Sequence, residues 1–119
     1  MTIEDELGRV VCERCMVADG PLTRLRGLLG RRELARDEGL LLRPSPSIHT
    51  WFMRFPIDAV FLSRDLRVLS VRASVPAWRM AAQRGARAVL ELPAGEAARR
   101  GVVAGTQLQS CPAGGFDGG

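Results

Sequence analysis

The fold is decided by the stretch His49-Thr-Trp-Phe-Met-Arg-Phe-Pro-Ile-Asp-Ala-Val-Phe-Leu62, which is the most hydrophobic and most aromatic part of the chain. It nevertheless contains ionisable side chains at His49, Arg54 and Asp58. Polar groups among apolar ones need hydrogen-bond partners or a ligand. The stretch is therefore either a well-connected part of the core or the wall of a pocket.

The first half of the stretch belongs to a predicted strand, Ile48–Phe55. Pro56 cannot donate a ladder hydrogen bond, so a bulge or bend is expected there. Period-two alternation places four side chains on one face of this strand, namely His49, Trp51, Met53 and Phe55.

The second half, Ile57–Leu62, is apolar on both faces, which predicts a strand covered on both sides. The next segment, Arg67–Val75, alternates between apolar and polar residues and follows a short turn, so the two should form a hairpin. The alternation places Leu69, Val71, Ala73 and Val75 inside and Ser70, Arg72 and Ser74 outside.

The other predicted elements are shorter. Further strands are expected at Arg9–Ala18, Gly39–Arg43, Ala86–Leu92 and Thr106–Gln109. Helices are expected at Pro21–Leu29, from its leucine spacing, and at Gly95–Arg100, whose charges suit the helix dipole. The segment Pro76–Gly85 is expected to be a loop.

Strands outnumber helices and are joined by short turns, which excludes alternating βαβ units. The predicted fold class is mainly β (α+β), an antiparallel β sandwich or barrel with two short helices. A chain of 119 residues is expected to form one domain. We expect a frayed N-terminus at 1–8, a single domain at 9–109 and a flexible glycine-rich tail at 110–119.

Composition places few limits on function. Apolar residues make up 46% and charged residues 25% of the chain, as in ordinary globular proteins. The net charge is +4, and all 17 basic residues are arginine. Five of these arginines fall between Arg24 and Arg36 without an aromatic residue among them, which indicates a solvated helix face rather than a nucleic-acid surface. No partner nucleic acid is therefore expected.

The acidic N-terminus lacks the pattern of a secretory signal, and no apolar run approaches the ~20 residues that span a bilayer. These observations predict a cytoplasmic protein without a membrane partner, and we expect a monomer.

A Cys-x-x-Cys motif lies at Cys12 and Cys15. On a regular strand, residues three apart point to opposite faces, so the two thiols can share a site only if Glu13-Arg14 forms a turn. Zinc needs two more ligands, for which Cys111 and His49 are the candidates. We interpret the pair as inert strand cysteines and predict no metal and no cofactor, with a metal or redox site as the alternative.

His49 is the only histidine and shares its predicted strand face with Met53. A soft-metal pair such as a copper(I) site is conceivable. A histidine hydrogen-bonded to backbone or carboxylate beside a core methionine is commoner.

Two carboxylates fall in predicted buried strands, Asp58 and Glu91. Each is costly there unless it is paired, with Arg54 or the loop beginning at Pro76 as candidate partners for Asp58. The two could act as acid and base across a cleft, or each could tie the structure together. The second interpretation is favoured.

Several pieces of the sequence, in a fixed order, resemble the bacterial and archaeal family called domain of unknown function 192. They are Arg24-Leu-Arg-Gly-Leu-Leu-Gly-Arg31, Gly39-Leu40, His49–Asp58, Phe61, Val89-Leu-Glu-Leu-Pro-Ala-Gly95, Gly101 and Gly105 before Leu108. The resemblance covers roughly 9–109. Two positions depart from the family pattern: Thr106 stands where an aspartate is usual, and Ser63 stands where an acid is frequent. The resemblance implies a jelly-roll-like β sandwich and no established activity.

The sequence therefore predicts a non-enzymatic domain that binds a small ligand or a protein segment in an aromatic-lined cleft. No catalytic residue is assigned. The candidate binding residues are His49, Trp51, Met53, Arg54, Asp58, Trp78 and Glu91. The alternatives are a hydrolase-like enzyme that uses Asp58 and Glu91, and a metal or redox site on Cys12 and Cys15.

Overall fold

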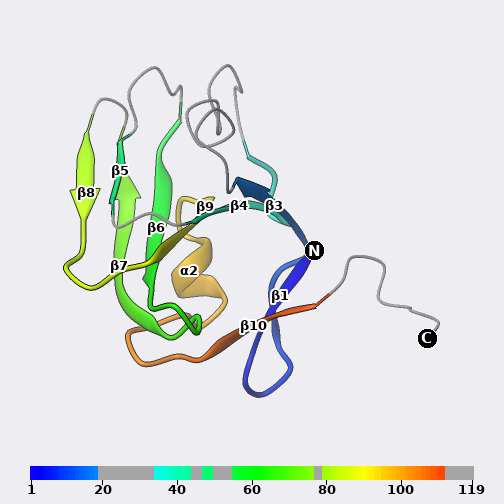
Figure 1. The fold of residues 1–119 in the computed structure, drawn as a ribbon. Coiled ribbons are helices and arrows are strands. Elements are labelled where there is room, and N and C mark those ends of the chain that lie inside the picture. The colour runs from blue at the N-terminus through cyan, green and yellow to red at the C-terminus, as the bar shows by residue number, and fades with distance from the viewer. Residues whose placement is uncertain (19–33, 44–46, 50–54, 77–78, 112–119) are drawn as a thin grey trace.

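The computed structural model describes residues 1–18, 34–43, 47–49, 55–76 and 79–111, and Figure 1 shows their arrangement. Within these residues the fold is mainly β, as predicted, with one short helix. The strands are β1 (Thr2–Asp5), β2 (Val10–Cys12), β3 (Arg14–Ala18), β4 (Glu38–Leu42), β5 (Ser47–His49), β6 (Ile57–Leu62), β7 (Val68–Val75), β8 (Met80–Ala82), β9 (Ala88–Pro93) and β10 (Leu108–Cys111). The helix is α2 (Glu96–Arg99). The other expected helix, Pro21–Leu29, lies outside the described residues.

The largest sheet has five strands in the order β3-β4-β9-β6-β7. Strands β6 and β7 form the predicted antiparallel hairpin, and β9 pairs antiparallel with both β4 and β6. The expected antiparallel arrangement fails at one edge, because β3 and β4 are parallel. Parallel neighbours require a long connection, and nearly twenty residues separate these two strands.

Two smaller sheets complete the described part of the fold. Strand β1 lies between β10 and β2 in one of them, and β5 pairs with β8 in the other. Residues 2–5 are thus paired on both edges, so the expectation of a frayed N-terminus at 1–8 is wrong. The pairing partner β10 is more than a hundred residues away in sequence, and local pattern does not reveal such a partner.

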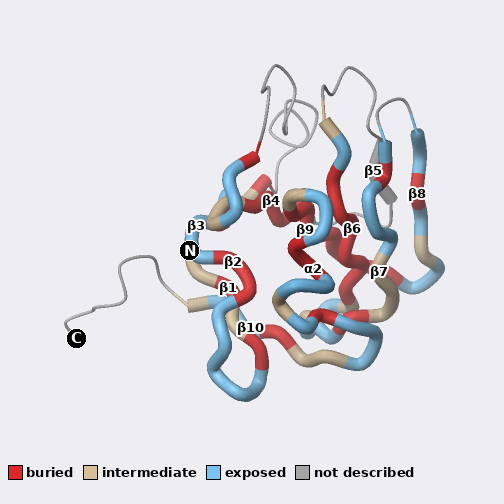
Figure 2. Tube along the Cα trace, turned by 180° about the vertical axis from the view of Figure 1, so that it is seen from behind, coloured by how far each residue is buried: buried red, intermediate tan, exposed pale blue. Residues whose placement is uncertain are grey.

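The five-stranded sheet is buried on both faces, as the apolar pattern of β6 predicts. One core lies between this sheet and the three-stranded sheet, with Val60 and Leu90 facing Ile3 and Leu108. The other core covers the opposite face, with Ile57, Ala59, Phe61 and Val89 packed near Ala81 of β8. Figure 2 shows the buried central strands β4, β6 and β9 between more exposed segments.

Three local predictions need correction. The expected strand Arg9–Ala18 is interrupted by a bend at Glu13, which separates β2 from β3. The expected loop Pro76–Gly85 contains strand β8, paired with β5. The expected alternation of β7 fails at Ala73, which is exposed.

The failure in β7 has a geometric cause. Ile57 pairs with Val75 and Ala59 with Arg72, so β7 has one extra residue opposite β6. A bulge of this kind reverses the faces of the residues beyond it. Ser74, at the bulge, has a positive φ of 51°.

Among the described residues, no helix has the length and apolar character needed to cross a membrane.

Candidate functional site

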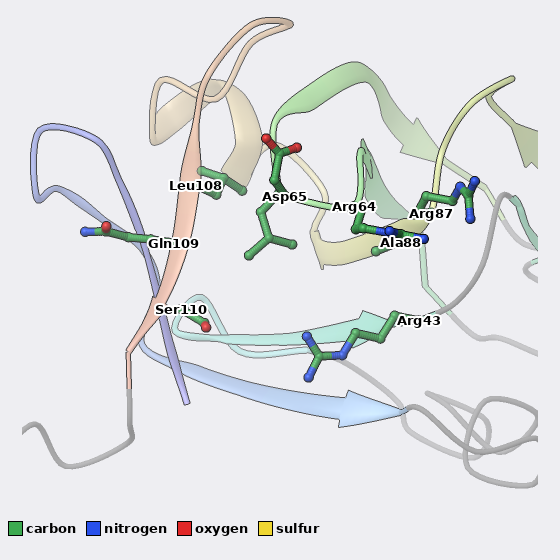
Figure 3. Close-up of a pocket in the computed structure, with 9 residues that line it drawn as sticks. Arg43, Arg64, Asp65, Arg87, Ala88, Leu108, Gln109 and Ser110 are labelled. Atoms are coloured by element: carbon green, nitrogen blue, oxygen red, sulfur yellow. The ribbon is translucent and has the colours of Figure 1, made fainter.

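A groove opens where the ends of several strands meet, and Figure 3 shows its lining residues. Its volume is about 700 Å³. Apolar side chains form part of it, namely Leu66, Ala88 and Leu108, and its polar residues are Arg43, Arg64, Asp65, Arg87, Gln109 and Ser110. Arg43 extends from the end of β4 toward Ser110 on β10, across the groove.

Backbone hydrogen bonds hold these segments in place. The Arg87 N–H donates to Leu62 O at 2.8 Å, which joins the start of β9 to the end of β6. The Leu108 N–H donates to Leu66 O at 3.0 Å, which joins β10 to the β6–β7 turn. The arginines therefore project from a rigid frame even though their own side chains are exposed.

The groove carries an excess of positive charge. Within the described part of the chain, the guanidinium groups of Arg43, Arg64 and Arg87 have no hydrogen-bond or ion-pair partner. The one carboxylate in the lining, Asp65, accepts a hydrogen bond from the Ser63 hydroxyl, which lowers the pKa of Asp65. Three cations face one anion, so the groove should attract negatively charged ligands.

Asp58, a predicted site residue, is buried at 1% exposure and connects three parts of the backbone. Its Oδ1 accepts from the Ser74 N–H at 2.8 Å, and its Oδ2 accepts from Gly95 and Ala97 N–H at 3.0 Å each. Asp58 thus holds the bulge of β7 and the N-terminus of α2 against β6. The expected partners were Arg54 and the loop beginning at Pro76, but these three donors lie in β7 and at the start of α2, and Arg54 lies outside the described residues.

Glu91 does not approach Asp58. The two strands pair Ala59 with Glu91 and Asp58 with Leu92. Since neighbouring residues of a strand point to opposite faces, the two carboxylates lie on opposite sides of the sheet. Asp58 shares its face with Val60, in the core that contains α2, whereas Glu91 shares the other face with Ala59. This arrangement is incompatible with acid–base cooperation between them.

The Glu91 carboxyl group is itself unusual. It is 4% exposed, and no described residue forms a hydrogen bond or ion pair with it. Burial raises its pKa to about 8. At neutral pH the group is therefore mostly protonated and uncharged, which is how a carboxyl group tolerates an apolar core.

The two cysteines of the motif lie together, contrary to the expectation for a continuous strand. The bend at Glu13 turns both side chains into the same core, where Cys15 is the strand partner of Gly39 and Cys12 Sγ lies beside that glycine. The Cys12 thiol also contacts Asp37 O at 3.7 Å. No group of three or more metal-binding side chains exists among the described residues.

Of the remaining predicted site residues, His49 is the one that lies in the described part of the chain. The backbone of His49 lies in β5, whose partner β8 packs on the core opposite the cysteines. The others, Trp51, Met53, Arg54 and Trp78, lie outside the described residues. The aromatic cleft that they were expected to line stays a prediction.

The family model described as "Uncharacterized ACR", DUF192, matches residues 2–110. The chain belongs to the DUF192 family. The match begins at β1 and ends within β10, so it includes the N-terminal strand that the resemblance over 9–109 left out. No curated protein matches the chain.

Two solved structures resemble this DUF192 protein closely. One is a protein of unknown function from Novosphingobium aromaticivorans DSM 12444, 26% identical, with a TM-score of 0.79 over 92% of this chain and 82% of that one. The other, from Sinorhizobium meliloti 1021, is described as a "putative transcription regulator". It is also 26% identical, with a TM-score of 0.78 over 91% of this chain and 89% of that one.

Sequence reasoning missed the arginines of the groove. Arg43, Arg64 and Arg87 are at least twenty residues apart and share no motif. The conspicuous arginine cluster at 24–36 attracted attention instead. A signal was present in one respect only: each of the three residues lies within two residues of the end of a predicted strand, where side chains from several strands can converge.

Proposed function

We propose that this DUF192 protein is a non-enzymatic binding domain whose groove holds a small organic anion with a phosphate or carboxylate group. The proposal narrows the binding function expected from the sequence to one ligand class. The observation that carries it is the meeting of Arg43, Arg64 and Arg87 around one groove, without acidic partners among the described residues.

The chemistry of the lining supports this ligand class. A guanidinium group donates paired hydrogen bonds that match the oxygens of a phosphate or carboxylate. The apolar side chains of Leu66, Ala88 and Leu108 suit the hydrocarbon part of an organic anion. A volume of about 700 Å³ falls in the range of small-molecule sites.

The alternative enzymatic function has weaker support. It required Asp58 and Glu91 to act together, and they point to opposite faces of the sheet. Asp58 is also fully used by three backbone donors. Among the described residues that line the groove, no nucleophile is paired with a base. A monomer without a nucleic-acid or membrane partner remains part of the proposal, and light scattering after gel filtration measures the oligomeric state.

Calorimetric titration with phenyl phosphate and with benzyl alcohol tests the proposal, because the two probes share a ring and differ in charge. We expect binding of phenyl phosphate that weakens with added salt, and no binding of benzyl alcohol. Replacing Arg43 or Arg87 by Gln should weaken binding roughly tenfold or more, since a hydrogen bond to a charged group contributes about 1.5–3 kcal/mol.

Arg72 provides the matched control, because it is an exposed arginine on β7 and does not line the groove. Arg72→Gln removes the same charge and should leave the affinity within about twofold. Equal affinities of the Arg43→Gln, Arg87→Gln and Arg72→Gln variants would refute the groove as the site. Benzoate serves as the carboxylate probe. If neither phenyl phosphate nor benzoate binds the unmodified protein, the proposed ligand class is refuted.

A further inference from the structure

The cysteine motif has a geometry that the anion groove does not use. Cys12 ends β2 and Cys15 lies in β3, with the bend at Glu13 between them. Both side chains belong to the same core, at 0% and 4% exposure. The third cysteine, Cys111, lies in β10, opposite Thr2 of β1.

Contacts on both sides of the bend keep the thiols together. Arg14 forms two hydrogen bonds with the Asp37 carboxylate, at 2.7 and 3.0 Å, and its N–H donates to Asp37 O at 2.7 Å. The Glu13 carboxylate pairs with Arg100 at 3.0 Å. The bend is therefore anchored to two separate segments, and these contacts fix the backbone between the two cysteines.

The packing around the pair is close. A Cβ atom added to Gly39 would meet Cys12 Sγ at 2.8 Å, so β4 accommodates the sulfur only because this position is glycine. Because Cys15 is the strand partner of Gly39, both cysteines lie next to this glycine.

We propose that Cys12 and Cys15 are a redox site, at which a hydroperoxide converts the two thiols into a reversible disulfide. The Cys15 thiolate attacks the peroxide, forming a sulfenic acid and releasing hydroxide from hydrogen peroxide. The Cys12 thiol then attacks the Cys15 sulfur, and water leaves. In total, two thiols and one hydrogen peroxide give one disulfide and two waters, so the protein loses two electrons and two protons.

The order of the two cysteines follows from their surroundings. The neighbouring Cys12 thiol lowers the pKa of Cys15, whereas the neighbouring Cys15 thiol and burial raise the pKa of Cys12. Cys15 is therefore the attacking group and Cys12 the resolving group. Strand β3 is an edge strand of its sheet and pairs with β4 on one side. On the other side the Cys15 N–H donates to Met1 O at 2.8 Å and the Cys15 carbonyl accepts from the Met1 amino group at 3.2 Å, so opening must also break these two bonds. Edge strands open more readily than central ones. A small peroxide can reach Cys15 through such an opening.

Mass spectrometry of the Cys111→Ser variant tests the site, since only the two motif thiols remain. Cleavage after arginine separates the cysteines into the peptides Val10–Arg14 and Cys15–Arg24. After treatment with hydrogen peroxide and blocking of free thiols, we expect these peptides joined by a disulfide, with two thiols lost per chain. Dithiothreitol should restore both thiols.

The Cys12→Ser and Cys15→Ser variants, each in the Cys111→Ser background, test the order of the steps. With Cys15 alone, a sulfenic acid should accumulate and react with dimedone. With Cys12 alone, dimedone labelling should be at least tenfold slower. Met16 and Met80 are exposed and gain oxygen under the same treatment, so the joined peptides, and not the total mass, are the readout.

The proposal is overturned if both thiols survive peroxide in the folded Cys111→Ser variant. It is also overturned if they are oxidised to sulfinic acids without joined peptides, because thiols held in contact form a disulfide faster than they are oxidised further. A circular dichroism spectrum that matches the unmodified protein confirms that the variant is folded.

Discussion

Replacing Asp58 by Asn tests the buried hydrogen bonds that join three segments of the fold. The carboxylate of Asp58 accepts from the N–H groups of Ser74, Gly95 and Ala97. An amide has the same shape but offers one acceptor and one donor. The least costly orientation leaves the amide oxygen facing Gly95 and Ala97, and turns its NH₂ toward the more accessible Ser74 N–H.

The magnitude follows from counting these bonds. Two bonds lose the contribution of a charged acceptor, and the third is lost entirely. Hydrogen bonds to charged groups contribute about 1.5–3 kcal/mol and neutral ones about 0.5–1.5 kcal/mol. We expect Asp58→Asn to lower the free energy of unfolding by about 3.5–6 kcal/mol, which corresponds to a melting temperature lower by roughly 15–25 °C. Asp58→Leu strands all three donors, and the same count gives a cost of about 4.5–9 kcal/mol, which reaches the total stability of many domains.

Urea denaturation followed by circular dichroism measures the loss, and amide hydrogen exchange locates it. Exchange at Ala97 should accelerate more than exchange in β4, because α2 loses its anchor first. Asp65→Asn is the control, since that carboxylate is exposed and should change stability by less than about 1 kcal/mol. A stability for Asp58→Asn within 0.5 kcal/mol of the unmodified protein would refute the reasoning.

Two further predictions concern the buried ionisable side chains of Glu91 and Arg100. The pKa of Glu91 is about 8 in the folded protein, compared with an ordinary value of 4.5. Protonation of this group therefore contributes stability that is fully present below pH 4.5 and is lost as the pH rises through about 8. Glu91→Gln should remove this loss of stability, because glutamine does not ionise. Urea denaturation at pH 8 should therefore show the variant to be more stable than the unmodified protein. A stability that depends more steeply on pH in the variant would contradict the raised pKa of Glu91. Arg100, 9% exposed, pairs with Glu96 and Glu13 and donates to Val10 O and Arg36 O. Arg100→Ala should cost about 2–4 kcal/mol in thermal or urea unfolding, because it removes these bonds and leaves buried Glu96 with only the exposed Arg99 as a cation among the described residues. Arg99→Ala, at a side chain 49% exposed, should cost less than about 1 kcal/mol, and equal losses for the two variants would show that burial does not matter here.

The strand pattern was predictable where burial is expressed in the local sequence. Ile57–Leu62 is apolar on both faces, and β6 has the predicted bounds and lies between two cores. Strand β1 was missed for the opposite reason. Its four residues, Thr2–Asp5, have no strong pattern, and they are held by pairing with β10 at the far end of the chain.

The candidate site was predictable only in part. The burial of Asp58 and Glu91 followed from their apolar neighbours, and both are buried. Their separation by the sheet depends on the pairing of Ala59 with Glu91, which no local pattern contains. A register shifted by one residue would have placed them on the same face.

The amino-acid pattern by itself determined which segments are extended, which of them are buried, and that carboxylates and thiols lie among apolar residues, because these properties depend on neighbours within a few positions. Only the tertiary structure decided which face each group occupies and which groups meet. Long-range pairing set the register that parts Asp58 from Glu91, and the joined strand ends brought Arg43, Arg64 and Arg87 to one groove. The anchored bend at Glu13 turned Cys12 and Cys15 toward each other, because contacts with Asp37 and Arg100 outweigh the alternation of a regular strand.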